Sequence, residues 1–130
     1  MAFLMKRDMD LIRTLLIQIE ESASPTSLGN LVTQNPGVKF PELQYNLKQL
    51  YDAEYIEGVY TAFASGGFDL LRIELTWKGH DFIDSVRDDE VWAKTKKGAE
   101  EARGFTIDLL KDLAKGLVKK KIEEHTGITL

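Results

Sequence analysis

Two segments of alternating side chains flank a pair of glycines, and this pattern constrains the fold more than any other feature of the chain. The alternating apolar or β-branched residues are Val59, Thr61 and Phe63, then Leu71, Ile73 and Leu75. A two-residue period is typical of β-strands, and Ser65-Gly66-Gly67 is a typical turn sequence. The sequence therefore predicts a β-hairpin over residues 59–75.

Helical periodicity lies on both sides of this hairpin. Before it, apolar residues recur at spacings of three and four, which predicts two amphipathic helices. Their buried positions are Met9, Ile12, Leu15, Leu16 and Ile19 in the first helix, and Leu43, Leu47 and Leu50 in the second. Asp8 is placed to cap the first helix and Pro41 to begin the second. The second helix is expected to end by Ala53-Glu54.

A third helix is expected directly after the hairpin, capped by Thr76 and burying Phe82, Ile83 and Val86. Gly79 would let this helix approach a neighbouring backbone closely. Between the first two helices, residues 24–40 have no clear period. A short helix is slightly favoured over a strand for residues 26–34, and Asn35-Pro36-Gly37 predicts a turn.

Asp88-Asp89 is expected to start a further turn or helix that presents Trp92, and the C-terminal part is expected to hold one more helix after it. Residues 96–104 are predicted to be a polar linker, and Thr106 is placed to cap the last helix. Its apolar face consists of Ile107, Leu110, Leu113, Ala114, Leu117 and Val118. Such a stripe must be covered, either by the preceding domain or by a second subunit. The expected organisation is a domain over residues 1–97, followed by a linker and helix over residues 98–130.

This order of elements is typical of an α+β winged-helix domain with a two-stranded wing and an additional C-terminal helix. Trp77 and Trp92 are expected to be buried in the core or between domains rather than to bind a ligand, because an indole ring buries a large area. The absence of cysteine from the 130 residues excludes disulfides and thiol nucleophiles. No stretch approaches the ~18 apolar residues of a membrane span. A cytoplasmic protein is therefore expected.

Charge is unevenly distributed along the chain, whose formal net charge is −4. Residues 1–90 hold eight Lys/Arg against fifteen Asp/Glu, which leaves −7, whereas residues 91–130 hold nine against six, which leaves +3. An acidic body with a mildly basic tail gives no general attraction to nucleic acid or to anionic membranes.

Three stretches resemble an uncharacterised winged-helix family that is common in bacteriophages and prophages and is catalogued as a domain of unknown function. They are KRDMDLIR at residues 6–13, YNLKQL at 45–50 with YIE at 55–57, and LTWKGHDFID at 75–84 with VRDD at 86–89 and VW at 91–92. The resemblance covers roughly residues 5–97 and implies the fold, without functional residues to carry over. Similar chains usually have Gly at the position of Glu54, and residues 24–40 match poorly.

DNA binding is the first functional hypothesis, because winged helices often place their third helix in a major groove. Gln44, Lys48 and Gln49 on the second long helix, and Arg72 in the wing, would then face the DNA. Lys48 and Arg72 are the only cations among these four residues, whereas a typical DNA-binding protein makes ~6–10 phosphate contacts. This hypothesis rests on analogy of fold.

The alternative is a protein–protein interaction module with an acidic surface and no DNA binding. Phe68 beside the paired glycines either folds back onto the core or meets a partner. Leu110 and Leu117 of the last helix are the residues expected to contact a partner or to form a homodimer.

An enzyme is not expected, because the sequence contains no motif for a nucleophile, a phosphate loop or a dinucleotide. His80, Asp81, Asp84 and Asp88 have spacings that resemble those of metal ligands, but any exposed acidic helix has the same spacings, and the family resemblance accounts for these residues without a metal. No catalytic residue, metal or cofactor is therefore predicted.

Overall fold

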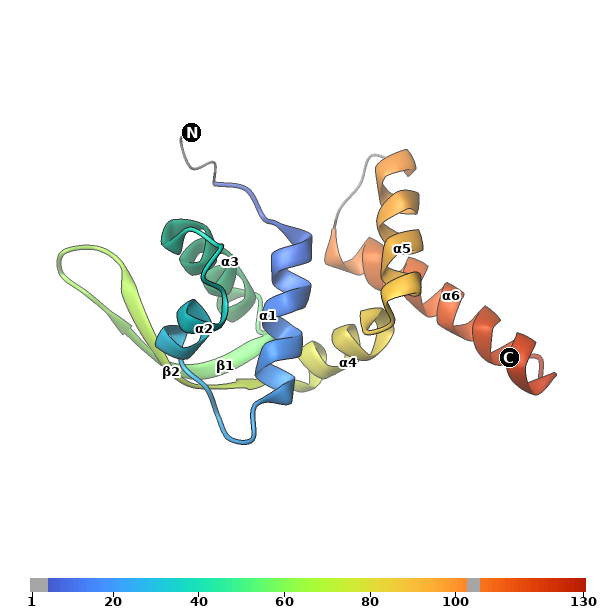
Figure 1. Ribbon diagram of the computed structural model, residues 1–130, viewed down its shortest axis with the longest axis horizontal. Helices are drawn as coiled ribbons and strands as arrows, with labels where there is room; N and C mark the ends of the chain where they lie inside the picture. The colour runs from blue at the N-terminus through green and yellow to red at the C-terminus, as the bar shows by residue number, and fades with distance from the viewer. Residues whose placement is uncertain (1–4, 103–105) are drawn as a thin grey trace. The chain divides into compact units, whose positions relative to one another are not determined.

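A computed structural model describes residues 5–102 and 106–130, and in this part of the chain the fold is mixed α+β (Figure 1). The elements are α1 (Met9–Glu21), α2 (Leu28–Gln34), α3 (Phe40–Asp52), β1 (Ile56–Ala62), β2 (Phe68–Leu75), α4 (Trp77–Val86), α5 (Asp89–Ala102) and α6 (Ile107–Thr126). The chain divides into two compact units, Met1–His80 and Asp81–Leu130. The α+β class is confirmed, and the expected domain boundary at residue 97 stays a prediction.

Helix α1 begins and buries its apolar face as predicted. The carboxylate of Asp8 accepts a hydrogen bond from the backbone N–H of Leu11 at 3.1 Å, which is the bond of a helix N-cap. The buried residues of this helix are Met9, Leu11, Ile12, Leu15, Leu16 and Ile19. The period of the sequence thus identified the face that packs against α3 and β2.

The ambiguous segment after α1 contains both a helix and a strand-like contact. Ser27 caps the short helix α2 through the N–H of Asn30. Just before it, Thr26 and Ile73 exchange two backbone hydrogen bonds, of 3.1 and 2.8 Å, across an isolated antiparallel bridge. The prediction of a short helix is confirmed, and the bridge ties this segment to the far edge of β2.

Helix α3 ends in the backbone conformation that glycine normally supplies. Its buried residues include Leu43, Leu47 and Leu50, as predicted. Glu54 has a φ of 65°, and the next N–H, of Tyr55, returns to the carbonyl of Leu50 at 2.9 Å. The helix therefore ends with a left-handed residue although Glu stands at that position.

The antiparallel hairpin β1–β2 is confirmed, but its register shifts between Glu57 and Val59. Gly58 lies at this bulge, where an added Cβ would be 2.7 Å from the carbonyl oxygen of Leu71. Opposite it, Arg72 has a φ of 54°. Because a bulge inserts one residue, Leu71 no longer shares a face with Ile73 and Leu75. The prediction that these three lie on one side is therefore wrong for Leu71, which is exposed.

Helix α4 starts directly at the end of the hairpin. Thr76 caps it by accepting the N–H of Gly79 at 3.1 Å, and the Thr76 hydroxyl donates to the carbonyl of Glu54 at 2.6 Å. Gly79 packs onto the backbone carbonyl of Tyr55 so closely that a Cβ would overlap it, as predicted. Trp77 is 90% exposed, so its predicted burial is wrong. It is the first residue of α4 and lies away from the buried stripe of that helix.

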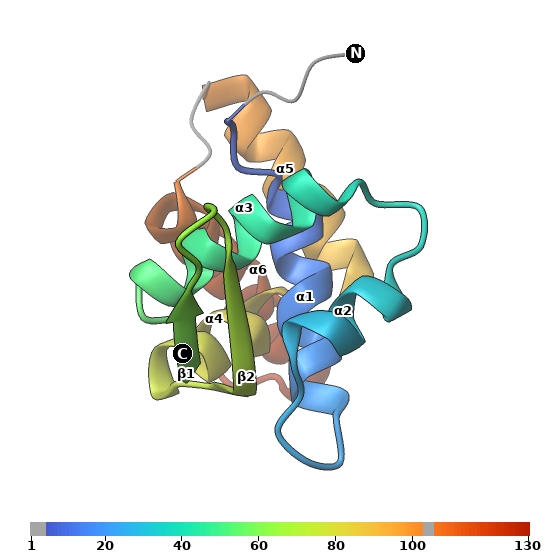
Figure 2. The same ribbon diagram turned by 90° about the vertical axis from the view of Figure 1, so that its left-hand side faces the viewer.

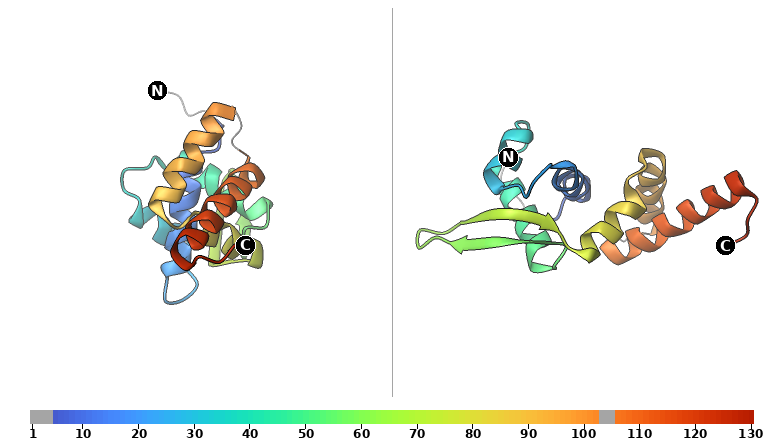
Figure 3. Two further views of the ribbon diagram at one scale, coloured as in Figure 1. Left: turned by 90° about the vertical axis from the view of Figure 1, so that its right-hand side faces the viewer. Right: turned by 90° about the horizontal axis from the view of Figure 1, so that it is seen from below.

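Residues 81–130 are organised around the packing of α5 on α6 (Figure 3). Asp88 caps α5 by accepting the N–H of Val91 at 2.9 Å. Buried residues on these two helices are Val91, Trp92, Thr95, Ala99, Ile107, Leu110 and Ala114. The predicted linker is wrong for residues 96–102, which are helical. Its Lys, Ala and Glu residues favour helix, and Ala99 is buried; residues 103–105 lie outside the described residues.

Two acidic side chains tie the start of this unit to α6. Asp81 is paired with Lys111 and, at 3.6 Å, with Lys115. The hydrogen bond from Lys111 lowers the pKa of Asp81. The N–H of Val91 and then Lys121, 3.0 Å away, lower the pKa of Asp88. Both carboxylates thus remain ionised in the folded unit.

Candidate nucleic-acid interface

The segment before α1 is held against α3 by one buried amide. The backbone N–H of Asp8 donates to Oδ1 of Asn46 at 2.8 Å, and Nδ2 of Asn46 donates to the carbonyl of Glu42 at 2.8 Å. Asn46 is only 1% exposed. A buried amide with both ends bonded has one favourable orientation, so it fixes the position of its partner. We refer to residues 5–8 as the arm.

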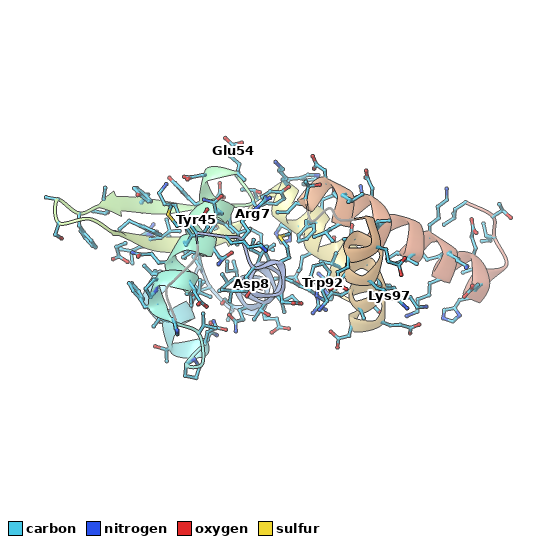
Figure 4. All side chains as sticks on the ribbon, turned by 90° about the horizontal axis from the view of Figure 1, so that it is seen from above. Arg7, Asp8, Tyr45, Glu54, Trp92 and Lys97 are labelled. Atoms are coloured by element: carbon cyan, nitrogen blue, oxygen red, sulfur yellow. The ribbon has the colours of Figure 1, made fainter. Side chains whose placement is uncertain are left out.

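A groove of about 370 Å³ runs between the arm, α3 and the hairpin. Its lining residues are Met5, Pro41, Gln44, Tyr45, Lys48, Tyr60, Gly67 and Phe68. Figure 2 shows α3 beside the hairpin, and Figure 4 shows Arg7 on the arm with Tyr45 on α3. The arm therefore belongs to the same surface as α3.

Three stacked aromatic rings fix the hairpin to α3. Tyr51 of α3 stacks on Tyr60 of β1 with ring centroids 5.3 Å apart, and Tyr60 stacks on Phe68 of β2 at 5.1 Å. Phe68 is 5% exposed. Of the two alternatives considered for Phe68, the structure shows the one in which the ring folds back onto the chain's own core. Helix α3 and the hairpin are therefore in direct contact through these rings.

Lys48 points into this groove with its charge partly balanced. Its Nζ lies 2.7 Å from Oδ2 of Asp52 and 5.7 Å from the centroid of the Tyr60 ring. The hydrogen bond to Asp52 raises the pKa of Lys48. The ammonium group is therefore charged at neutral pH and is held over the groove by an exposed ion pair.

Three further cations lie on the arm and at the start of α3, and they are absent from the residues predicted from the sequence. Lys6 and Arg7 are exposed on the arm, and Lys39 is the exposed N-cap residue of α3. The signal that points to the arm is a basic pair directly before the capping Asp8. The contact between Asp8 and Asn46 spans 38 residues, so no local pattern could place that pair beside α3.

A family model described as a hypothetical protein, DUF2513, matches residues 6–106, which is most of the chain. The chain belongs to the DUF2513 family. It is also 28% identical over 121 residues to an uncharacterized protein of Haemophilus influenzae, covering 91% of this chain and 99% of that relative. No solved structure matches it. The expected membership of a family of unknown function is confirmed.

The other predicted binding residues of this DUF2513 protein lie apart from the groove. Gln49 is half-buried on α3 and does not line the groove, and Arg72 is exposed at the bulge of β2. Leu110 is buried and Leu117 half-buried on α6. The structure thus brings Gln44 and Lys48 together at the groove. Binding of DNA or of a partner by any of these residues stays a prediction.

The acidic residues around α4 and the start of α5 are engaged in ion pairs. Asp81 and Asp88 pair with lysines of α6, and Asp84 pairs with Arg87 at 2.8 Å. Within residues 5–102 and 106–130, no three His, Asp or Glu side chains are grouped as metal ligands. None of the helices in these residues is long and apolar enough to cross a membrane.

Proposed function

We propose that this DUF2513 protein contains a winged-helix domain that binds double-stranded DNA, with α3 as the recognition helix and β1–β2 as the wing. The order of α1, α2, α3 and a two-stranded hairpin supports this proposal, as does the short turn that joins α2 to α3. The proposed role is regulatory and non-enzymatic, in the cytoplasm. Its origin in a phage or prophage rests on the resemblance of the three sequence stretches.

The observation that carries this proposal is the hydrogen bond between Asp8 and Asn46. It holds the arm, which carries Lys6 and Arg7, against α3, whose own cations are the N-cap Lys39 and Lys48 and whose acidic residues are Glu42 and Asp52. An arm that precedes the first helix and carries cations is a recurring DNA contact in helix-turn-helix proteins. This surface is thus more cationic than α3 and the wing alone.

The neutral polar residues of α3 supply the means to read bases. Glutamine can form a bidentate contact with the edge of adenine in the major groove. Gln44 lies at the groove, and Gln49 is also on α3. We therefore assign phosphate contacts to Lys6, Arg7, Lys39 and Lys48, and a base contact to Gln44, the glutamine that lines the groove.

The test is binding of the full chain to a mixed-sequence duplex at low salt, compared between two doubly substituted variants. Lys6→Glu/Arg7→Glu should weaken binding by more than about tenfold, because each lost phosphate contact removes a charge interaction. Lys119→Glu/Lys120→Glu on α6 changes the net charge equally and should have a much smaller effect. Equal effects would contradict the proposed surface, and no binding by the wild type would favour the protein-interaction alternative.

A further inference from the structure

The hairpin has a second face, which does not line the groove. Along β1 the side chains alternate, so Tyr60 faces the groove while Val59 and Thr61 lie on the opposite face. On that outer face Val59 is 53% exposed, and its cross-strand partner Leu71 is 46% exposed. Phe63, just beyond β1, is 50% exposed. Val59 and Leu71 form an exposed apolar pair, and Phe63 lies beyond the Thr61–Asp69 pair toward the turn. We call Val59, Leu71 and Phe63 the outer patch.

The same face is acidic at the end of the hairpin nearest α4. Glu57 and Glu74 are exposed and lie directly opposite each other in the register. Like charges at directly opposed positions of two strands destabilise the pair. Asp69, opposite Thr61, adds a third carboxylate on the turn side of the Val59–Leu71 pair. Within the two strands the single basic residue is Arg72.

We propose that the outer patch is the docking site of a partner protein that presents an apolar segment with an adjacent Lys or Arg. The apolar side chains of the partner cover Val59, Leu71 and Phe63. Its cation lies between Glu57 and Glu74, where it offsets their mutual repulsion. This interaction goes beyond DNA binding and uses the opposite face of the same hairpin.

Charge complementarity selects this occupant. A second copy that docked through the same face would bring its own Glu57, Glu74 and Asp69 against those of the first, and nucleic acid would be repelled by the same groups. A basic apolar segment satisfies both parts of the surface. Glu57 lies two residues before Val59 on β1, so the acidic pair is about 7 Å from the apolar pair. One helical turn, or two positions of a strand, in the partner covers a similar distance between its cation and its apolar side chain.

The test uses two synthetic amphipathic peptides as probes, one with leucines flanked by lysines and one with glutamate at every lysine position. Fluorescence anisotropy measures their binding to the full chain. The lysine peptide should bind and the glutamate peptide should not. Val59→Ser/Leu71→Ser should weaken binding of the lysine peptide by about tenfold or more, and the matched control Ile122→Ser on exposed α6 should leave it unchanged. Glu57→Lys/Glu74→Lys should reverse the preference between the two peptides.

Equal binding to the wild type and to Val59→Ser/Leu71→Ser would overturn the proposal, and so would no binding of the lysine peptide. A wild-type dimer in sedimentation that the same substitutions dissociate would also overturn it, because a second copy would then cover the outer patch. All substituted positions are exposed, so circular dichroism should show unchanged folding. Val59→Ser/Leu71→Ser should still bind DNA, because neither residue lines the groove. Its DNA binding therefore tests the proposed function separately from the docking of the peptide.

Discussion

Asn46 of α3 accepts the backbone N–H of Asp8 at 2.8 Å and thereby joins the start of α1 to the helix proposed to contact DNA. The Asn46 side chain is buried and the bond itself part-buried, and the second half of the amide is bonded to the carbonyl of Glu42. The position of the arm therefore depends on one polar side chain within an otherwise apolar helix face.

Replacing this amide should destabilise the fold measurably. Asn46→Leu has a similar volume but leaves the N–H of Asp8 without its acceptor, which should cost about 1–3 kcal/mol of unfolding free energy. Asn46→Asp keeps the acceptor oxygen and should retain the bond to Asp8. Urea unfolding of the two variants tests this. If Asn46→Leu is as stable as the wild type, the bond does not hold the arm.

Gly79 should tolerate no side chain. The carbonyl oxygen of Tyr55 occupies the space of a Cβ at this position, and it also accepts the N–H of Thr76 at 3.2 Å. Gly79→Ala should therefore lower the unfolding free energy by about 3 kcal/mol, at the upper end for overpacking. Gly116→Ala in α6 is the matched control, because a Cβ there meets no atom within 4 Å. Gly116→Ala should raise the unfolding free energy by about 0.5–1 kcal/mol.

Replacing Glu54 by glycine, the residue that similar chains usually have at this position, should stabilise the fold. Its φ of 65° costs a residue with a Cβ about 1–2 kcal/mol. Glycine has no Cβ and does not pay this cost. Glycine also loses more backbone entropy on folding, so Glu54→Gly should give a net gain of about 0.5–1 kcal/mol in thermal unfolding. Glu54→Ala keeps the Cβ and should give no such gain. A gain of equal size for Ala would point to charge rather than backbone conformation.

Local patterns predicted the elements whose contacts are local. The caps at Asp8 and Thr76, the stripe of α1 and the close approach at Gly79 all depend on residues near in sequence or on residue type. The tight turn also follows from its glycines, since Gly66 and Gly67 have φ values of 92° and 83°.

Features that depend on distant residues were not predictable in this way. The bulge at Arg72 reverses the face of Leu71, and it follows from contacts across the hairpin. The burial of Phe68 requires Tyr60 and Tyr51 beside it. The arm's place in the candidate site follows from Asn46, whose partner lies 38 residues away. A helical period identifies which residues are buried, but it does not identify the hydrogen-bond partner of a buried polar side chain such as Asn46.

Acidic pH should weaken the ion pairs that Asp81 and Asp88 form with lysines of α6. The folded-state pKa values of Asp81 and Asp88 are lowered from 3.8, so their pairs contribute stability above the unfolded pKa and lose it as pH falls through the lower folded values. The melting temperature followed by helical circular dichroism should therefore fall below about pH 4 more in the wild type than in Asp81→Asn/Asp88→Asn. Asparagine at position 88 still caps α5. Identical pH profiles would show that these pairs do not stabilise the unit.

The central claim is that the arm and α3 form one DNA-binding surface, and the salt dependence of duplex binding tests it most directly. Four phosphate contacts, from Lys6, Arg7, Lys39 and Lys48, predict that log K falls with log salt with a slope of about −3.6. In Lys6→Gln/Arg7→Gln the slope should shrink to about −1.8. A slope near zero, or the same slope in wild type and variant, would contradict the account.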